Sequence, residues 1–282
     1  VADDMHLGLR APNIWFRARL LYKDANAPDG KVDVSGFTLP GIPAVIVGSN
    51  THVAWGFTNS YGDWLDWYAV HPGDKIDTYK EKILVKGAAP VEFDIRESHG
   101  RPIMAKDVNG GELALSWVAH QPGSLSTKIF SLASVKDNNE ALALFQQSGM
   151  PHQNAVFGDS SGKIAWKLTG LQKYWAPGCQ RTLPLDDHNP NDDKNPNDIA
   201  CFTAAPTPDY LHPQIVSPDS NRLWSANARV TDGEMLRQIG DAGYANGARA
   251  KQIRDDLFAK QQFTEKDLLA IQLDDRTLFL QP

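Results

Sequence analysis

Two stretches of the sequence contain residue types that could do chemistry, and the first is Gly-Asp-Ser-Ser-Gly at 158–162. It fits the Gly-x-Ser-x-Gly pattern, in which a strand–turn–helix holds a serine above a sheet for attack on an ester or amide. Here the motif is followed by Lys-Ile-Ala-Trp-Lys-Leu at 163–168, whose alternation indicates a strand. Because Asp, Ser and Gly also favour hairpin turns, we predict a turn at 158–162. A serine hydrolase that uses Ser160 is the alternative.

The second stretch is Asp-Trp-Leu-Asp at 63–66, which places two carboxylates three residues apart around the backbone carbonyl of Leu65. Such oxygen ligands suit calcium, which accepts carboxylates and carbonyls in flexible geometry. The eight histidines are scattered and lack the three- or four-residue spacing of a helical zinc motif. From these residues alone, two solvated turn aspartates remain the alternative to a calcium site.

The only two cysteines, Cys179 and Cys201, bracket a segment rich in Asp, Asn and Pro. Such a loop has few apolar contacts to close it, and a disulfide across it would remove roughly 3 kcal/mol of unfolded-chain entropy. We predict this bridge, with two unrelated thiols as the alternative. A bridge indicates an extracytoplasmic compartment, either periplasmic or extracellular.

Composition excludes several classes of function. The 282 residues are 41% hydrophobic, which is enough to fill a core, and 28 Lys and Arg against 34 Asp and Glu give a net charge of −6. Without a basic run, a nucleic-acid partner is not expected. No apolar stretch approaches the roughly 20 residues of a membrane span. The chain starts without a signal-peptide pattern and ends in Leu-Phe-Leu-Gln-Pro, so we expect a piece of a longer polypeptide, cut at both ends.

The elements that must position these residues are mostly strands. Apolar and β-branched runs between turn residues predict strands at 43–47, 53–58, 82–85, 91–96, 112–118, 154–158 and 163–168. Helical patterns appear at 138–147, 248–259 and 265–273, the first and last with capping residues at Asp137 and Thr264. The stretch at about 174–222 looks irregular, and we interpret it as an insertion, with a linker between domains as the alternative.

A series of short motifs, taken together, resembles the β subunit of the penicillin acylase family, which are N-terminal nucleophile hydrolases. The family carries Pro-Gly-x-Pro, Gly-x-Asn, Ala-Trp-Gly-x-Thr-Asn and Asp-x-x-Asp in this order, as found here at 40–43, 48–50, 54–59 and 63–66. Ala-Asp-Asp-Met-His-Leu at 2–7 is similar to the family's Ala-Asn-Asp-Pro-His-Leu, although Asp3 and Met5 depart from it. Further similarities fall at 12–16, 159–166, 225–230 and 248–253, so the resemblance covers nearly the whole chain.

The resemblance implies a mechanism for amide hydrolysis. In this family a chain-terminal serine attacks the carbonyl, and its own α-amine, with a pKa of about 7.7–8, accepts the hydroxyl proton. That serine would lie about 20 residues before His6, so we expect residues 1–282 to be inert alone. The side-chain amide of Asn227 and the backbone N–H of Asn59 would form the oxyanion hole. Arg249 would lie near the α-amine, and the carbonyl of His6 would orient it.

The resemblance also implies ligands. Asp63, the carbonyl of Leu65 and Asp66 match the family's calcium site. The acyl group of the substrate would contact Leu7, Val47, Phe57 and Gln153. The substrate class would be a small-molecule N-acyl amide, such as a β-lactam side chain, an acyl-homoserine lactone or a lipopeptide.

The implied fold is α+β, a four-layer αββα sandwich of antiparallel sheets, of which residues 1–282 would form a partial core with the insertion at about 174–222. Maturation of such precursors in the periplasm yields two chains. A missing α subunit and the rest of the β subunit would then be obligatory partners. The alternative from another class is a calcium-stabilised binding module that has lost catalysis.

Overall fold

The computed structural model describes residues 1–4, 7–146, 149–171, 174–175, 185, 202–203 and 212–280. The chain divides into two compact units. Unit 1 comprises Val1–Gly62, Pro122–Gln172 and Pro206–Pro282, and unit 2 comprises Asp63–Gln121 and Lys173–Ala205. No helix among the described residues combines the length and the apolar character needed to cross a membrane.

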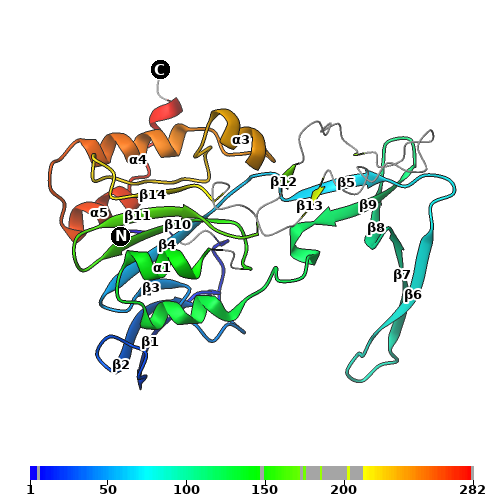
Figure 1. Ribbon diagram of the computed structural model, residues 1–282, viewed down its shortest axis with the longest axis horizontal. Coiled ribbons are helices and arrows are strands. Elements are labelled where there is room, and N and C mark those ends of the chain that lie inside the picture. Colours follow the sequence, from blue (N-terminus) through cyan, green and yellow to red (C-terminus); the bar gives the residue numbers. More distant parts are fainter. Residues whose placement is uncertain are drawn as a thin grey trace. The chain divides into compact units, whose positions relative to one another are not determined.

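Unit 1 is built on a seven-stranded sheet in the order β1-β2-β3-β4-β10-β11-β14, in which every neighbouring pair is antiparallel (Figure 1). The strands are β1 (Phe16–Lys23), β2 (Lys31–Thr38), β3 (Val47–Ser49), β4 (Val53–Asn59), β10 (Gln153–Asp159), β11 (Ile164–Leu168) and β14 (Gln214–Val216). Neighbouring strands β4 and β10 lie at the centre and pair along their whole length, Asn59 opposite Gln153 and Val53 opposite Asp159. The centre of the sheet is therefore an unbroken antiparallel ladder.

One face of this sheet carries the hydrophobic core. Alternate residues of β4 (Val53, Trp55 and Phe57) are buried, because side chains of a strand alternate between its two faces. They pack against helices η2 (Thr127–Ser134) and α1 (Asn138–Leu144), and Phe57 meets Phe145 edge to face at 6.0 Å between ring centroids. The buried Nδ2 of Asn50 donates to the carbonyls of Leu132 and Val135 at 3.0 and 2.7 Å. Helix η2 is thereby fixed to the β3–β4 turn.

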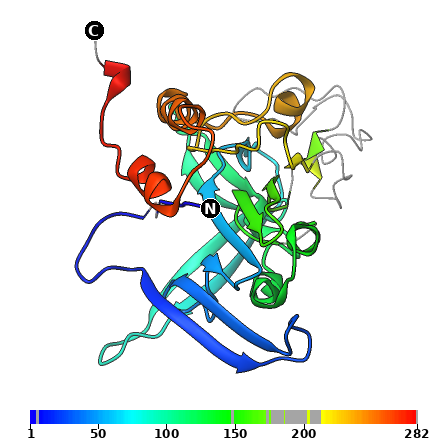
Figure 2. The ribbon, with the colours of Figure 1, turned by 90° about the vertical axis from the view of Figure 1, so that its left-hand side faces the viewer.

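The opposite face of β4 and β10 presents small residues, and the first residues of the chain lie on it. A side chain at Gly56 would begin 2.8 Å from Cβ of Asp3, and one at Gly158 would begin 3.2 Å from Cγ2 of Val1. These glycines allow residues 1–4 to approach the sheet closely. Helices α4 (Ala248–Phe258) and α5 (Glu265–Gln272) lie on this side, opposite to α1 and η2 (Figure 2).

The helix caps agree closely with the sequence. Asp137 caps α1 by accepting from the N–H of Glu140 at 3.0 Å, although the Glu140 side chain bonds to Lys136 N and not to the cap. Thr264 and Asp267 form the reciprocal capping box predicted for α5. The remaining helices of the described residues are α3 (Gly233–Ile239) and two 3₁₀ turns, η1 (Val118–His120) and η4 (Leu278–Leu280).

Unit 2 contains a five-stranded antiparallel sheet in the order β5-β9-β8-β7-β6. Its strands are β5 (Leu65–Ala69), β6 (Ile76–Ile83), β7 (Val91–Ser98), β8 (Arg101–Lys106) and β9 (Glu112–Trp117), and a short pair is formed by β12 (Tyr174–Trp175) and β13 (Phe202–Thr203). Tyr68 of β5, Ala114 of β9 and Leu185 form a small core. The β6–β7 hairpin is largely exposed, with cross-strand ion pairs on one face.

The sequence located most central elements and missed several others. The strands predicted at 53–58, 91–96, 112–118, 154–158 and 163–168 and all three helices are present. The strand predicted at 43–47 is present only from Val47, in β3, and the one predicted at 82–85 coincides only with the end of β6. Strands β1, β2 and β8 were not predicted. Strand β1 is exposed along most of its length and lacks a clear alternation of buried and exposed residues. Strand β14 lies inside the stretch predicted to be irregular. Cys179 and Cys201, with the disulfide predicted between them, lie outside the described residues.

The pairing of β2 with β3 depends on two facing glycines. Gly36 and Gly48 are opposite in register, and a Cβ at Gly36 would lie 2.0 Å from the carbonyl oxygen of Val47 and 2.7 Å from Cα of Gly48. Both contacts are with backbone, which cannot move aside without breaking the ladder. We expect Gly36→Ala to lower the free energy of unfolding by about 3 kcal/mol, the upper end for overpacking. Urea unfolding measures it.

The matched control is Gly8→Ala, where a Cβ would meet no atom of the described residues within 4 Å. It is expected to change the free energy of unfolding by less than about 0.5 kcal/mol. Equal stabilities for the two variants would show that the β2–β3 contact tolerates a side chain.

Candidate active site

A pair of asparagines meets at the end of β4. The side-chain Nδ2 of Asn227 donates to the backbone carbonyl of Asn59 at 3.1 Å. Asn59 is the last residue of β4, and Asn227 follows a non-helical segment that runs towards this strand end. A primary carboxamide has two N–H donors, and among described residues Nδ2 makes this one hydrogen bond. Its second hydrogen is available to a ligand.

The backbone N–H of Asn59 faces the same side of β4. The next residue, Ser60, donates its N–H to the carbonyl of His152 on the β10 side at 3.2 Å. Because successive N–H groups of a strand point in opposite directions, the N–H of Asn59 points away from β10. Its carbonyl also points away from β10, and this is the group that receives Asn227. The structure therefore places two donors on one side of the strand end.

Asn227 is held in an uncommon conformation. Its φ is 60°, in the left-handed region that Asn tolerates better than most side chains. Arg249, in the first turn of α4, donates from Nη2 to Oδ1 of Asn227 at 2.9 Å. Since a guanidinium can only donate, this contact identifies the oxygen of the carboxamide and turns Nδ2 towards Asn59. Asn59, Asn227 and Arg249, all candidates from the sequence, are thus brought together.

Strand β10 supports the same strand end. Nε2 of Gln153 donates to Oδ1 of Asn59 at 2.7 Å, and Oε1 of Gln153 is buried without a hydrogen-bond partner among the described residues. The next side chain, Asn154, is 1% exposed, accepts from the Trp166 indole at 3.2 Å and contacts the Asn59 carbonyl at 3.5 Å. Sequence reasoning missed Asn154, because an asparagine within an apolar strand carries no signal of where its side chain points.

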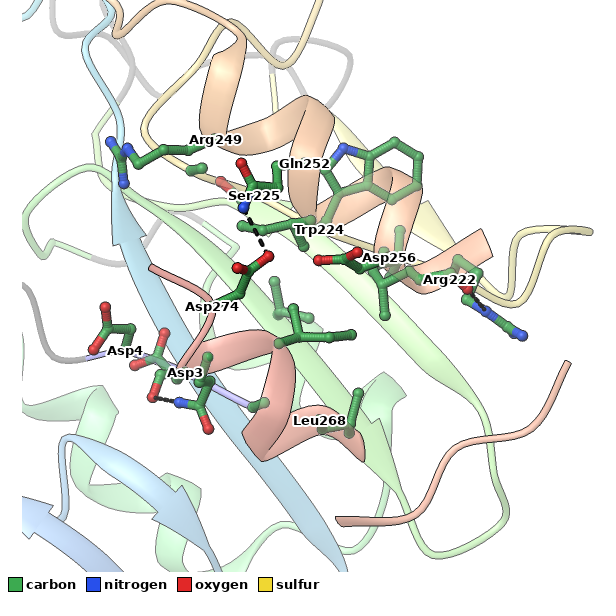
Figure 3. A pocket seen from close by; sticks show the side chains of 18 of the residues that line it. Asp3, Asp4, Arg222, Trp224, Ser225, Arg249, Gln252, Asp256, Leu268 and Asp274 are labelled. Carbon is green, nitrogen blue, oxygen red and sulfur yellow. Dashed lines mark hydrogen bonds between the residues drawn. The ribbon is translucent and has the colours of Figure 1, made fainter. Parts of the chain in front are cut away.

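A large cavity of about 1200 Å³ lies beside these residues, between the sheet and helices α4 and α5. Its lining includes Asn227, Arg249 and Thr58 together with apolar residues such as Val156 and Leu268. Figure 3 shows Arg249 at one end and Asp3, Asp274 and Asp256 around the interior. The cavity combines apolar walls with charged groups, as small-molecule sites do.

Among the acidic residues that line this cavity, Asp3 has the pKa that is raised most. Burial, as the largest effect, raises its pKa from 3.8 to about 7, with a smaller contribution from Asp4. Its carboxyl group accepts from the backbone N–H of Phe57, which opposes that rise. Phe57 precedes Asn59 by two residues, so both N–H groups point to the same side of β4. Nε2 of Gln272 on α5 binds the carbonyl of Asp3 at 2.5 Å.

A second acidic group in the cavity is balanced by a cation. Asp274 accepts from Gln252 at 2.7 Å (Figure 3) and from Arg276 at 2.7 Å, and Arg276 is the main reason that its pKa is lowered. Burial is the main cause of the raised pKa of the neighbouring Asp256, and its hydrogen bond with Asp274 adds to it. One of these two carboxyl groups is therefore easier to protonate than the other.

The other predicted substrate-contacting residues occupy different environments. Val47 and Phe57 belong to the buried core cluster, and Phe57 also borders the cavity. Leu7 is exposed. His6, whose carbonyl was predicted to orient the nucleophilic amine, lies outside the described residues. Of the four residues predicted for the acyl pocket, Gln153 is the one whose side chain hydrogen-bonds to Asn59.

The predicted calcium ligands lie in unit 2. Asp63 precedes β5, Leu65 begins it, and Asp66 is buried and pairs in register with Ser116 of β9. A buried carboxylate needs hydrogen bonds or a counter-charge. The described part of the chain contains no group of three His, Cys, Asp or Glu side chains arranged to hold a metal ion. These residues therefore offer hard oxygen donors, but only part of a six- to eight-oxygen calcium shell.

The stretch at 158–162 is a hairpin turn, as predicted. Asp159 ends β10, its Oδ1 accepts from the N–H groups of Ser161 and Lys163 at 3.0 and 3.2 Å, and β11 follows at Ile164. The N–H of Ser160 donates to the carbonyl of His52 at 2.8 Å. A nucleophile elbow requires a helix after the serine. The presence of β11 removes the serine hydrolase alternative.

Comparison with solved structures identifies the fold. The chain matches the thermostable penicillin G acylase from Alcaligenes faecalis with a TM-score of 0.72 and 18% identity, covering 94% of this chain and 47% of that chain. The α+β fold of N-terminal nucleophile hydrolases, with antiparallel sheets, is thereby confirmed.

The penicillin amidase family model matches residues 1–281, and this chain belongs to that family of acylases. Acyl-homoserine lactone acylase QuiP from Pseudomonas aeruginosa is 23% identical over 99% of this chain and 34% of that protein. QuiP from Pseudomonas fluorescens strain Pf0-1 is 25% identical, again over 99% of this chain and 34% of that protein. QuiP from Pseudomonas syringae pv. syringae is 27% identical over 60% of this chain and 22% of that protein. The chain spans about a third of the length of the curated relatives that it matches end to end.

Proposed function

We propose that this chain supplies the oxyanion hole of an N-acyl amide hydrolase. The observation that carries the proposal is the meeting of Asn227 and Asn59, with two N–H donors on one side of β4. In amide hydrolysis the carbonyl oxygen gains negative charge as the tetrahedral intermediate forms. Two fixed neutral donors stabilise that charge without a proton change and without rearranging during the reaction.

Arg249 contributes to this arrangement in two ways. Its hydrogen bond to Oδ1 of Asn227 keeps the carboxamide from turning over, which would present an oxygen to the developing oxyanion. A cation bonded to the carboxamide oxygen also polarises the group, so that its N–H donors become stronger. By resemblance, the same guanidinium would keep the nucleophilic α-amine neutral and able to accept a proton.

The attacking group in this proposal lies outside residues 1–282. It is a chain-terminal serine whose α-amine takes the hydroxyl proton and later returns it to the leaving amine. Residues 1–282 alone are then inactive, and the active enzyme contains a separate α subunit and the rest of the β subunit. The family's maturation by chain cleavage, which frees the serine amine, belongs to the same proposal.

The substrate proposed is a small N-acyl amide. QuiP is named for acyl-homoserine lactones, and the structural neighbour is named for penicillin G. Both substrates present an acyl group on an amide nitrogen, so the proposed chemistry at Asn227 and Asn59 is the same for either. The apolar walls of the adjacent cavity suit an acyl chain.

The test is to express the parent polypeptide with the sequence upstream of residue 1 and to determine the mature N-termini by mass spectrometry. We expect a new chain that begins with serine about 20 residues before His6. Hydrolysis is then followed with acyl-homoserine lactones of several chain lengths and with a phenylacetyl amide. A mature chain beginning with a residue other than Ser, Thr or Cys, or no hydrolysis of any of these amides, contradicts the proposal.

We also propose that Asp63, the carbonyl of Leu65 and Asp66 supply part of a calcium shell. The donor set is purely oxygen, which calcium prefers, and Trp64 lies between the two aspartates. Terbium, which replaces calcium and luminesces when a nearby Trp is excited, reports binding without any need for catalysis. We expect calcium to compete with terbium, and a chelator to lower the melting midpoint.

Asp63→Asn is expected to abolish both the luminescence and the chelator effect, while the exposed Asp77→Asn, on β6, leaves both unchanged. A melting midpoint that does not respond to chelator in the unaltered protein would exclude a bound calcium.

The compartment is proposed to be periplasmic or extracellular, in keeping with a disulfide between Cys179 and Cys201. Alkylation of the unfolded protein before and after reduction tests the disulfide. Uptake of two alkyl groups only after reduction is expected. Uptake without a reductant would contradict the bridge.

A further inference from the structure

The segment at 221–227, which ends in Asn227, lies in neither a helix nor a sheet. Among the described residues no backbone–backbone hydrogen bond involves 222–226, and the nearest ones join Asn221 to Pro218 and Ala245 to Asn227. A segment that makes no backbone–backbone hydrogen bonds depends on its side chains to hold it in place. The position of the Asn227 carboxamide therefore depends on the contacts that side chains of this segment make.

Arg222 makes the most extensive of these contacts. Its Nε donates to the carbonyl of Leu257 at 3.0 Å, and its Nη2 donates to the carbonyls of Lys260 and Gln261 at 3.1 and 2.8 Å. Nη1 donates to the carbonyl of Asn221 at 3.0 Å. The last carbonyls of a helix lack partners within it and carry partial negative charge, so a rigid guanidinium with five donors suits the end of α4.

The other end of the segment is bound to the opposite end of the same helix, through Arg249 and Asn227. From 249 to 257 the helix rises by about 12 Å, at 1.5 Å per residue. The six residues from 222 to 227, which are joined by five steps, span at most about 17 Å when fully extended. Because Arg222 binds the last turn of α4 and Asn227 binds its first turn, the segment runs antiparallel to the helix. Since both ends of this short segment are bound to the same helix, we expect a displacement at Arg222 to reach Asn227.

Two residues between Arg222 and Asn227 also hold the segment in place. Trp224 meets Phe258 of α4 edge to face at 5.9 Å, and Oγ of Ser225 lies 2.7 Å from Oγ1 of Thr58 on β4. Figure 3 shows Arg222, Trp224, Ser225 and Arg249 arranged along this path. The segment thus connects α4 to the strand that ends at Asn59.

We infer that Arg222 is a positioning residue for the Asn227 carboxamide, acting through the segment 221–227 and the carbonyl end of α4. Its effect on catalysis rests on the proposed function, whereas its effect on the position of Asn227 does not. Lysine cannot replace it, because a single ammonium group cannot reproduce the fork that reaches three carbonyls. Arg254 offers a matched control on the same helix, since it is exposed and, within the described part of the chain, pairs only with Asp255.

The experiment compares Arg222→Lys and Arg222→Met with Arg254→Met. In the mature protein labelled with ¹⁵N-asparagine, the side-chain amide resonances of Asn227 and the backbone resonance of Asn59 are recorded well below each melting midpoint. We expect both to shift or broaden in the two Arg222 variants and to stay unchanged in Arg254→Met. In the mature enzyme we expect kcat to fall by about 10- to 100-fold in Arg222→Lys, with KM within about twofold, since a displacement of about 1 Å can have this effect.

Unchanged Asn227 resonances in folded Arg222→Lys, with only a lower melting midpoint, would overturn the inference and leave Arg222 as a helix cap. Displaced resonances support it, whether or not the enzyme has been shown to be active. If Arg222→Met does not fold, Arg222→Lys still provides the comparison. Displaced resonances with an unaltered kcat would count against Asn227 as an oxyanion donor, which is a failure of the proposed function and not of the positioning.

Discussion

Asn227→Asp is expected to lower kcat of the mature hydrolase by about 10²–10³-fold, which is the usual effect of losing one oxyanion donor. Aspartate has almost the same shape as asparagine and also tolerates the left-handed φ of 60°. The substitution therefore tests the N–H donor and not the backbone. It replaces the donor that faces the Asn59 carbonyl at 3.1 Å by an oxygen, which cannot donate when ionised.

The control for this prediction is Asn246→Asp, close to the start of α4. Oδ1 of Asn246 accepts from the N–H of Ala248 at 3.1 Å, and a carboxylate can accept the same bond. We expect its kcat to remain within about twofold of the unaltered enzyme, because exposed substitutions that keep their contacts have small effects. If Asn227→Asp retained full kcat on every amide tested, Asn227 would not be an oxyanion donor.

The second large effect is a pH dependence of stability that comes from Asp3. Its pKa is raised to about 7 in the folded chain, against 3.8 for the free group. The folded state thus holds the proton more tightly, so the contribution of Asp3 to stability is full below about pH 4 and is lost as pH rises to about 7. At about 1.4 kcal/mol per pH unit, the free energy of unfolding falls by roughly 3 kcal/mol between pH 5 and pH 8.

Asp3→Asn should remove this dependence, because a carboxamide stays neutral and can still accept from the N–H of Phe57. The measurement is urea unfolding at several pH values from 5 to 8, read as the difference between the variant and the unaltered chain. Contributions from other acids cancel in that difference. Asp267, whose pKa is lowered to about 2 chiefly by Lys260, titrates below this range.

Asp4→Asn serves as the control, since Asp4 is the exposed neighbour and makes only a minor contribution to the pKa of Asp3. In Asp4→Asn the free energy of unfolding should still fall with pH nearly as steeply as in the unaltered chain. If Asp3→Asn and the unaltered chain lost stability in parallel, Asp3 would be ionised in the folded protein throughout this range. The family carries asparagine at this position, so the variant also restores the neutral side chain expected from the resemblance.

The strands and helices that carry the candidate site could be predicted because their signals are local. Strands β4 and β10 were predicted from apolar and β-branched runs bounded by turn residues, and Thr264 and Asp267 cap α5 through contacts three residues apart. The turn at 158–162 was likewise predicted from residues that favour turns. Strand β1 was missed because most of its residues are exposed, and an exposed strand has no buried face to produce alternation.

The geometry of the candidate site could not be predicted in this way, because it depends on contacts between residues that are far apart in the sequence. The types of Asn59, Asn227 and Arg249 came from short motifs, but their meeting joins residues 168 positions apart along the chain. The contacts of Asn154 with Trp166 and of Arg222 with the end of α4 had no sequence signal at all, since each depends on which carbonyl or amide lies within reach in three dimensions. The left-handed φ of Asn227 is also set by its surroundings.

By itself, the sequence determined the family, the central strands of unit 1 and the identity of the three residues at the end of β4. These features follow from local residue patterns and from the order of the motifs, which do not depend on the tertiary structure. The tertiary structure alone decided which way the Asn227 carboxamide faces, that Gln153 binds Asn59, and that Asp3 is partly buried against β4. Hydrogen-bond direction and desolvation arise only when distant segments pack together. No property of an isolated segment determines them.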